Sequence, residues 1–470
     1  MTLLLRALNG VVWSPPLLAL LLAAGLWFSL RSRFLQVRLL GPMLRLLTKG
    51  RAGDGISPFQ AFCTALAGRV GTGNIVGTSA AVLYGGPGAL FWMWVLAFLG
   101  AASAFVESTL AQLYREPWEG QYCGGPAFYI EKGLRRRGCA AVFAVVALTA
   151  SGLLLPGVQS NAIAQSLQAA FRLPVWLSGG VCTLLLGVLI FGGIRRIARA
   201  AEFIVPAMAA LYLLCAGAVT IAHLREVGPA FALILSSAFG RDALYGGIFG
   251  SAILWGVRRG IYANEAGQGT QAHAAAAAAA DHPAEQGLVQ ALGVYVDTFL
   301  ICTATGLMLL LTDCYNVLDG AGQVLHRGAP MIADCLEPGP RFVQAALASV
   351  LGPAGPALIA LCLAFFAFTS LMSCYYQAEC NLLWLLRSER RRAVGTPALR
   401  CALLIVTFTA ALMTADSVWS LGDLGAGTMA WLNGAAILLL QKPAFDSLRD
   451  YERRRKQAPC PPEPRPVLRR

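Results

Sequence analysis

Four poor helix formers, Gly71-Thr72-Gly73-Asn74, lie in the middle of an apolar segment of membrane-spanning length, residues 58–83. In hydrocarbon every backbone N–H and C=O must find a partner, so a broken helix persists at that depth only where it lines a protein cavity. Broken helices at the bilayer midplane are where transporters hold substrates and coupling ions. This stretch therefore predicts a binding cavity inside a membrane protein of the transporter class.

The composition is that of a membrane protein. Of the 470 residues, 57% are hydrophobic and 13% are charged, whereas a soluble protein carries about a quarter charged residues. Segments that approach the roughly 20 apolar residues of a spanning helix are found near 11–30, 58–83, 89–114, 140–168, 174–194, 200–223, 243–266, 287–312, 346–385, 398–415 and 419–441. They predict an all-α polytopic membrane protein with about eleven transmembrane helices.

The net charge of +13 follows membrane topology rather than a nucleic-acid surface. With the N-terminus outside, the inward loops and the tail after Gln441 carry 28 Lys and Arg residues, and the outward segments carry 6. This is the positive-inside bias of a bacterial inner-membrane protein. We predict an outside N-terminus, a cytoplasmic C-terminus and contact with anionic lipid, without nucleic acid or an obligatory protein partner.

The spans divide into one extra helix and two groups of five. Residues 1–57 are predicted to hold an extra N-terminal helix, retained rather than cleaved as a signal peptide, and a basic interfacial segment. The repeats are expected at 58–223 and 224–441, and five spans per group would invert the second repeat relative to the first. The basic tail, 442–470, is expected to be disordered.

In such an arrangement the site lies between the first helices of the two repeats, here 58–83 and 243–266. The second of these contains Gly246, Gly247, Gly250, Gly256 and Gly260. We assign Gly246 and Gly250 to close helix packing and Gly71 and Gly73 to a break. The alanine-rich run His273–Ala280 is expected to form a short inward helix.

The predicted break offers two kinds of ligand, because an unwound helix leaves N–H groups and carbonyls without partners. The N–H groups of Thr72, Gly73 and Asn74 could hold a substrate carboxylate. The carbonyls of Ala67 to Val70 could ligate a small cation, since hard cations take oxygen ligands. Both parts of an amino-acid and cation symport site would then be present without a charged ligand.

Two adjacent hydroxyls, Thr369 and Ser370, lie deep in the span 346–385. A threonine in a membrane helix commonly bonds a carbonyl of its own helix, and the sequence alone favours that interpretation. As cation ligands opposite the break, the two hydroxyls would complete an oxygen shell.

Other polar and aromatic residues within spans have both structural and functional interpretations. Gln159 could form an interhelical hydrogen bond or line a pocket. Trp255 and Tyr262 could wall a pocket or simply pack, and Asn264 gives the same span a polar end.

Arg69, one turn before the glycine pair, is the sharpest candidate among the intramembrane ionisable residues. It could fill the space of a second cation or pair with Glu107, and the sequence leaves both open. Asp297 and Glu379 are further candidate partners for the intramembrane arginines.

Neither the cysteines nor the histidines indicate catalysis. The 13 cysteines are dispersed without a Cys-x-x-Cys pair, which argues against a metal or disulfide framework. Cys314 and Cys335 share one predicted outward loop, so a disulfide between them stays open. Because no nucleophile and base set and no phosphate loop is visible, we expect neither an enzyme nor an organic cofactor.

At these residues the chain resembles the alanine/glycine:cation symporter family. The resemblance is carried by Thr-Ala-Leu-Ala-Gly-Arg-Val-Gly-Thr-Gly-Asn-Ile-Val-Gly at 64–77 and Gly-Gly-Pro-Gly-Ala-Leu-Phe-Trp-Met-Trp at 85–94. It continues through 124–129, 158–161, 256–269, 286–303, 368–370 and 419–433.

The resemblance implies a leucine-transporter-like fold, with ten core helices in inverted repeats plus one extra helix. It also implies that sodium is the coupling ion. The residues that it implies for substrate and sodium binding are these. Thr72 and Gly73 would hold the substrate carboxylate, and Asn74 would steady the break. Gln159 and the Tyr262–Asn264 segment would line the pocket. The backbone of Ala67 and Val70, with Thr369 and Ser370, would form the sodium site.

We therefore predict a sodium-coupled symporter that imports small neutral amino acids, alanine and glycine, by alternating access. Tyr262 stands where the family commonly has Phe, and Cys374-Tyr375-Tyr376-Gln377 replaces a stretch that usually contains Gly or Asn. These departures leave the exact substrate open. The alternatives are a proton-coupled or glutamine-type transporter of the same fold, or a receptor or channel that does not accumulate its ligand.

Overall fold

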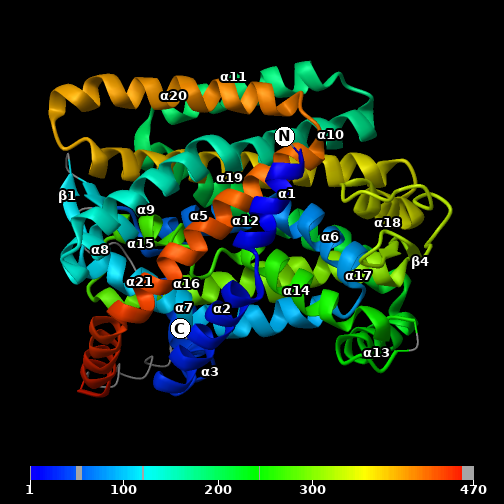
Figure 1. Cartoon of the computed structure of the whole chain (residues 1–470), viewed down its shortest axis with the longest axis horizontal. Coiled ribbons are helices and arrows are strands. Elements are labelled where there is room, and N and C mark those ends of the chain that lie inside the picture. The colour runs from blue at the N-terminus through cyan, green and yellow to red at the C-terminus, as the bar shows by residue number, and fades with distance from the viewer. Residues whose placement is uncertain (1, 49–54, 119–120, 243, 458–470) are drawn as a thin grey trace, which may run out of the picture.

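The computed structural model describes residues 2–48, 55–118, 121–242 and 244–457, and most of them are helical (Figure 1). Among these residues, eight helices are long and apolar enough to cross a membrane, and two shorter apolar helices accompany them. The described strands are short and form two antiparallel pairs. β1 (Glu116–Trp118) pairs with β2 (Gln121–Cys123), and β3 (Val317–Leu318) pairs with β4 (Val324–His326). The predicted all-α polytopic fold is confirmed.

The N-terminal segment forms a kinked candidate span followed by two short helices. Its elements are α1 (Thr2–Val12), α2 (Pro15–Arg31), α3 (Leu35–Arg38) and α4 (Leu40–Leu47). Pro15 begins α2, a position where its missing N–H costs nothing.

The next elements contain the first predicted break. They are α5 (Pro58–Arg69), η1 (Gly73–Gly77), α6 (Thr78–Gly85), α7 (Ala89–Leu113), α8 (Pro126–Leu134), α9 (Arg137–Thr149), η2 (Ala150–Leu154), α10 (Leu155–Phe171), α11 (Val175–Ile190) and α12 (Gly193–Ala222).

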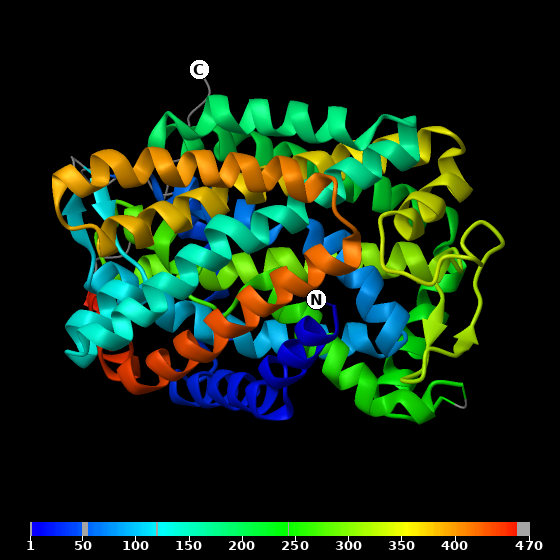
Figure 2. The same ribbon diagram turned by 45° about the horizontal axis from the view of Figure 1, so that its top comes forward.

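A second series follows. It comprises η3 (Leu224–Glu226), α13 (Val227–Ala238), η4 (Gly246–Ile248), α14 (Phe249–Asn264), α15 (Gln271–Ala277), α16 (Pro283–Tyr295), η5 (Val296–Cys302), α17 (Thr303–Leu311), α18 (Arg341–Leu351), α19 (Ala354–Leu385), α20 (Glu389–Ala411) and α21 (Ala415–Gln457). Helices of the first series pack against helices of the second series across the molecule. The helices α11 and α20 lie together along one edge (Figure 1), and α21 crosses the bundle beside the N-terminal helices (Figure 2).

The second series also contains a broken helix, and its break lies at the end of the predicted span 243–266. The helix α14 ends at Asn264, Glu265 is left-handed with φ 54°, and α15 starts only at Gln271. Gly267 and Gly269 supply φ values of 84° and 85°, which favour glycine. The run predicted as a separate inward helix at His273–Ala280 is therefore the second half of this broken helix.

The two broken helices lie against each other, α6 beside α14 and α5 beside α15. The first half of each broken helix therefore contacts the second half of the other. The breaks therefore come together near the middle of the molecule.

Close packing was predicted for Gly246 and Gly250, and a β-carbon at Gly246 would lie 3.0 Å from the Gly240 carbonyl oxygen. The tightest glycines of α14 itself are two others. A β-carbon at Gly256 would lie 2.5 Å from the carbonyl oxygen of Ala89, and one at Gly260 would lie 2.8 Å from Leu96. Gly250, which the sequence assigned to packing, has no atom within 4 Å of that position. Close approach to α7 thus depends on Gly256 and Gly260.

Two further expectations are changed, and one question that the sequence left open is answered. The span predicted at 346–385 is divided at Gly352 and Pro353 into α18 and α19. The tail predicted as disordered from 442 is helical as far as Gln457, and residues 458–470 lie outside the described residues. Cys314 and Cys335, for which a disulfide was open, are both free thiols.

Candidate functional site

The first broken helix begins and ends for local reasons. Ser57 caps α5 by accepting a hydrogen bond from the Gln60 N–H, while the Gln60 side chain accepts one from the Ser57 N–H, a capping box. At Val70 the backbone leaves the helical region with ψ 89°, and helical structure resumes at Gly73. The break predicted at Gly71-Thr72-Gly73-Asn74 is present.

Asn74 connects the two halves of the break to η5. Its Oδ1 accepts from the Gly71 N–H at 2.9 Å, and its Nδ2 donates to Asp297 Oδ1 at 2.6 Å. The other Asp297 oxygen accepts from the Thr298 hydroxyl at 2.8 Å. Asp297 therefore pairs with an amide and a hydroxyl rather than with one of the arginines considered for it.

Gln159 of α10 occupies the donors that were predicted for a substrate carboxylate. Its Oε1 accepts from the Thr72 N–H at 3.2 Å, and the Thr72 hydroxyl donates to the same oxygen. A ligand carboxylate that bound Thr72 would have to displace this amide oxygen.

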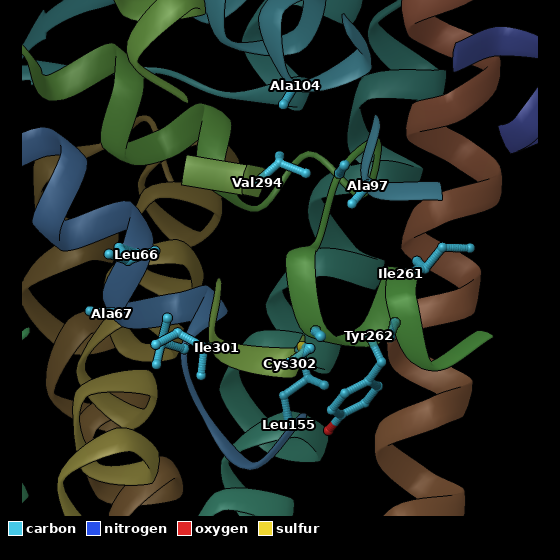
Figure 3. Packing of buried hydrophobic residues seen from close by; sticks show 14 of the residues in the cluster. Leu66, Ala67, Ala97, Ala104, Leu155, Ile261, Tyr262, Val294, Ile301 and Cys302 are labelled. Carbon is cyan, nitrogen blue, oxygen red and sulfur yellow. The ribbon is translucent and has the colours of Figure 1, made fainter. Parts of the chain in front are cut away.

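A small cavity lies at the breaks. Its volume of about 10 Å³ admits roughly one water molecule, so side chains must move before an amino acid can enter. Tyr262 of α14 and Leu155 of α10 both line this cavity and are labelled in Figure 3. The described residues that line the cavity are Gly68, Arg69, Gly71, Gly73, Leu155, Gln159, Tyr262, Glu265, Gln268, Cys374 and Ala426.

Four residues predicted to bind the substrate are not among these lining residues: Thr72 and Asn74, whose contacts are given above, and Trp255 and Asn264. Asn264 is buried, donates to the Thr298 hydroxyl at 3.3 Å and accepts from the Ala266 N–H at 3.0 Å. Trp255 packs against Tyr84 with ring centroids 4.5 Å apart and lines a different cavity.

That second cavity, about 610 Å³, opens beside α1 and the start of α21. Trp419 lines it and lies 5.1 Å from the Tyr262 ring, so these two aromatics lie between the two cavities. Asp423 accepts from Arg258 at 2.6 Å and from Arg259 at 2.8 and 3.1 Å. Asp423, which the sequence did not suggest as a partner, thus links α21 to α14.

The residues predicted for the cation come partly together. The Ser370 hydroxyl lies 2.9 Å from the Ala67 carbonyl, and Gly71 is close enough that a β-carbon there would lie 3.3 Å from Ser370 Cβ. Thr369 donates to the Phe366 carbonyl at 2.9 Å, within its own helix. Val70 is fully buried at the end of α5. These neutral oxygens fit a small hard cation, provided that the Thr369 hydroxyl turns toward the break.

Arg69 is buried and bonds backbone carbonyls. Its Nε donates to Asn264 at 2.8 Å and its Nη1 donates to Gln290 at 2.9 Å. Glu107 instead accepts from the Gly269 N–H at 3.0 Å and from the Asn433 side chain at 2.9 Å. Among the described residues no ion pair within 4.0 Å joins Arg69 to Glu107. Arg69 therefore holds the end of α14 against α16.

The second break contributes Glu265 and Gln268 to the cavity lining. Glu265 belongs to the polar end of the span 243–266 that the sequence singled out, whereas sequence reasoning missed Gln268. The Glu265 carboxylate accepts from the Thr270 hydroxyl at 2.7 Å and from the Gln271 side chain. Gln268 donates to the Ile261 carbonyl at 2.7 Å, which caps the end of α14. The signal was available, because Gly267-Gln268-Gly269 repeats the Gly-x-Gly pattern of Gly71-Thr72-Gly73.

Comparison with known proteins agrees with this architecture. A model of the sodium:alanine symporter family matches residues 1–463. The sodium/proton-dependent alanine carrier protein of Bacillus sp. (strain PS3) is 46% identical over 423 residues, 89% of this chain and 93% of that protein. GlnT of Bacillus subtilis (strain 168), named a probable sodium/glutamine symporter, is 40% identical over 456 residues, 96% of this chain and 91% of that protein.

A solved structure has a similar fold. MhsT, in complex with L-phenylalanine, superposes with a TM-score of 0.57 at 17% identity, covering 83% of this chain and 89% of MhsT. The expected leucine-transporter-like fold is therefore confirmed. The relatives are transporters rather than enzymes. This chain is a multi-pass membrane protein and belongs to the sodium:alanine symporter family.

Proposed function

We propose that this protein imports alanine and glycine together with sodium by alternating access. The observation that carries the proposal is the contact between Gln159 and Thr72. An uncharged amide oxygen there occupies the backbone and hydroxyl donors of a broken helix, and a carboxylate would bind the same donors more strongly.

The substrate carboxylate would take the Thr72 and Gly73 N–H groups and release Gln159. The freed Gln159 amide oxygen and the Glu265 carboxylate, both in the cavity lining, would then accept hydrogen bonds from the substrate ammonium. This assignment replaces Asn264 as the ammonium acceptor.

The walls favour a small side chain. Leu155, Tyr262, Cys374 and Ala426 line a cavity of about 10 Å³, so each added methylene would require further displacement of packed side chains. Alanine and glycine demand the least rearrangement. The relative named as a glutamine symporter makes glutamine the competing substrate to test.

Sodium would bind the carbonyls of Ala67 and Val70 and the hydroxyls of Thr369 and Ser370. Because this ion would hold the break in the geometry that also receives the carboxylate, sodium and substrate would increase each other's affinity by the same factor. The ion is carried as cargo and no organic cofactor takes part.

Access would alternate around the cavity. With the N-terminus outside, the Tyr262 and Trp419 pair and the Asp423 linkage would close the outer side. The contacts of α5 and α15 with α19 would close the inner side. In this arrangement residues 1–57 are an accessory segment to the repeats 58–223 and 224–441, and the protein lies in the bacterial inner membrane.

The test is uptake of labelled alanine and glycine into proteoliposomes under an inward sodium, lithium or proton gradient. Thr72→Val should raise the apparent Michaelis constant for alanine, and Thr369→Ala should raise the sodium concentration for half-maximal uptake. Thr220→Val and Thr407→Ala are matched controls, because both hydroxyls bond carbonyls of their own helices away from the break. Normal alanine and sodium dependence in both test variants would refute the site.

Proton coupling is the second candidate, supported by the Glu265 carboxylate in the cavity lining and by a relative named as sodium/proton-dependent. Uptake driven by a pH gradient without sodium, and lost in Glu265→Gln, would favour it. Ligand binding without accumulation under any gradient would instead indicate a receptor.

A further inference from the structure

A basic cavity far from the two breaks lies where α2 turns into α3 beside the last part of α21. Its volume is about 350 Å³, and its lining includes Arg31, Arg33, Arg38, Phe445, Arg449 and Glu452. Figure 1 shows α2 and α3 at the same edge of the molecule as the red end of α21. The elements that form it belong to the accessory segment and to the C-terminal helix.

The positive charge of this cavity is only partly compensated. Arg38 pairs with Glu452 at 2.6 Å, and Arg449 pairs with Asp446. Arg31 donates to the neutral Gln441 side chain at 2.7 Å and lies 5.1 Å from the Phe445 ring. Within the described part of the chain, neither Arg31 nor Arg33 has a carboxylate within 4.0 Å. Two arginines are thus available to an anionic ligand.

The backbone between α2 and α3 has an unusual conformation that brings these arginines together. Arg33 and Phe34 are consecutive left-handed residues with φ 56° and 52°, a region that residues with a β-carbon rarely adopt. Phe34 stacks on Phe98 at 6.2 Å and Ser32 is buried. Such strain is commonly found where a ligand is clamped.

The cavity lies at a membrane boundary. The candidate span Leu4–Arg31 ends at its edge. One turn earlier, Trp27 and Leu30 are 51% and 54% exposed, and the Trp27 indole donates to Gln441 at 2.7 Å. Tryptophan with one polar contact and an exposed ring is typical of the lipid headgroup region. An apolar surface thus leads directly from the span to the arginines.

We infer that this cavity binds the phosphate of an anionic phospholipid, with Arg31 and Arg33 on the phosphate and an acyl chain along Trp27 and Leu30. A guanidinium matches a phosphate with two parallel hydrogen bonds, and basic pockets between spans at one membrane face are typical headgroup sites. The apolar approach selects a phospholipid over free phosphate. The bound lipid would join the accessory helix to α21.

The test is native mass spectrometry of the full chain in detergent, titrated with phosphatidylglycerol or with phosphatidylcholine of the same acyl chains. An arginine near an anionic surface contributes roughly fivefold to binding, so R31Q/R33Q should weaken phosphatidylglycerol binding by roughly 25-fold. R45Q/R391Q is the charge-matched control, since both arginines are exposed and lie outside the cavity lining.

The wild type should prefer phosphatidylglycerol, and excess inorganic phosphate should not displace it. Equal binding by R31Q/R33Q and the wild type would overturn the inference. So would an equal loss in R45Q/R391Q, which would indicate general surface charge. Displacement by inorganic phosphate would indicate a phosphate site rather than a lipid site. Circular dichroism of each variant verifies folding, and none of these outcomes depends on transport.

Discussion

At the scale of single residues, Gly71 shows how the break is constrained by its neighbours. A β-carbon at this position would lie 3.1 Å from Gln159 Oε1 and 3.3 Å from Ser370 Cβ. Both distances are tighter than ordinary contacts, and the residues on either side are those proposed to bind substrate and ion. Only glycine leaves both side chains in place.

Gly71→Ala should therefore reduce alanine affinity. Overpacking costs about 1–3 kcal/mol, which corresponds to roughly 5- to 150-fold in a binding constant. Equilibrium binding of labelled alanine in the presence of sodium measures the change. Gly217→Ala in α12 is the control, because nothing lies within 4 Å of its β-carbon position; equal behaviour of the two variants would contradict the prediction.

Asn74 holds the break by donating to Asp297 and accepting from Gly71. Asn74→Ala would leave buried polar groups without partners, at about 1–3 kcal/mol each, so the denaturation temperature should fall. Asn74→Asp should also lower the denaturation temperature, since two carboxylates would then face each other. The exchange Asn74→Asp with Asp297→Asn restores one donor and one acceptor and should recover part of the loss. No recovery would mean that the pair is not the stabilising contact.

At the scale of elements, the contact of α14 with α21 depends on one carboxylate between two arginines. The Asp423 side chain is 3% exposed and those of Arg258 and Arg259 are 15% and 5% exposed. Breaking a buried ion pair by removing one partner costs about 3–5 kcal/mol, because the remaining charge is left without compensation.

Asp423→Ala should thus lower the denaturation temperature far more than Asp446→Ala, whose exposed pair with Arg449 is worth about 1 kcal/mol or less. If the linkage also closes the cavity, Asp423→Ala should increase the rate at which a small thiol reagent modifies Cys374, which lines it. Lower stability with an unchanged Cys374 rate would make Asp423 a structural brace only.

At the scale of the whole molecule, the topology is the prediction with the widest consequences. When Cys139, Cys401 and Cys460 are replaced by Ser, the remaining cysteines all belong to the described part of the chain and are buried. Restoring Cys139 should give labelling by a membrane-impermeant maleimide in inside-out vesicles only. Gly320→Cys, in the loop predicted to be outward, should label in intact cells only. The reverse pattern would invert the topology and the assignment of outer and inner closures.

Much of this architecture could be predicted from local sequence. Helical spans follow from the length of apolar segments, and the first break follows from four adjacent poor helix formers, Gly71 to Asn74. Both are properties of a continuous stretch of chain in hydrocarbon, where unsatisfied backbone groups are costly. The family pattern is likewise a series of short local motifs, which is why fold and family were predicted correctly.

The partners of the site residues were settled by tertiary packing. Gln159 and Thr72 are 87 residues apart in the chain, and Arg259 and Asp423 are 164 apart. Nothing local distinguishes Asp423 from Asp297 as a partner for an arginine, because pairing depends on which helices meet and at what height. Asn264 faces Thr298 while the adjacent Glu265 lines the cavity, since α14 ends between them and the left-handed Glu265 redirects the chain. That change of direction comes from the packing of two broken helices against each other, and it decides which side chains line the cavity.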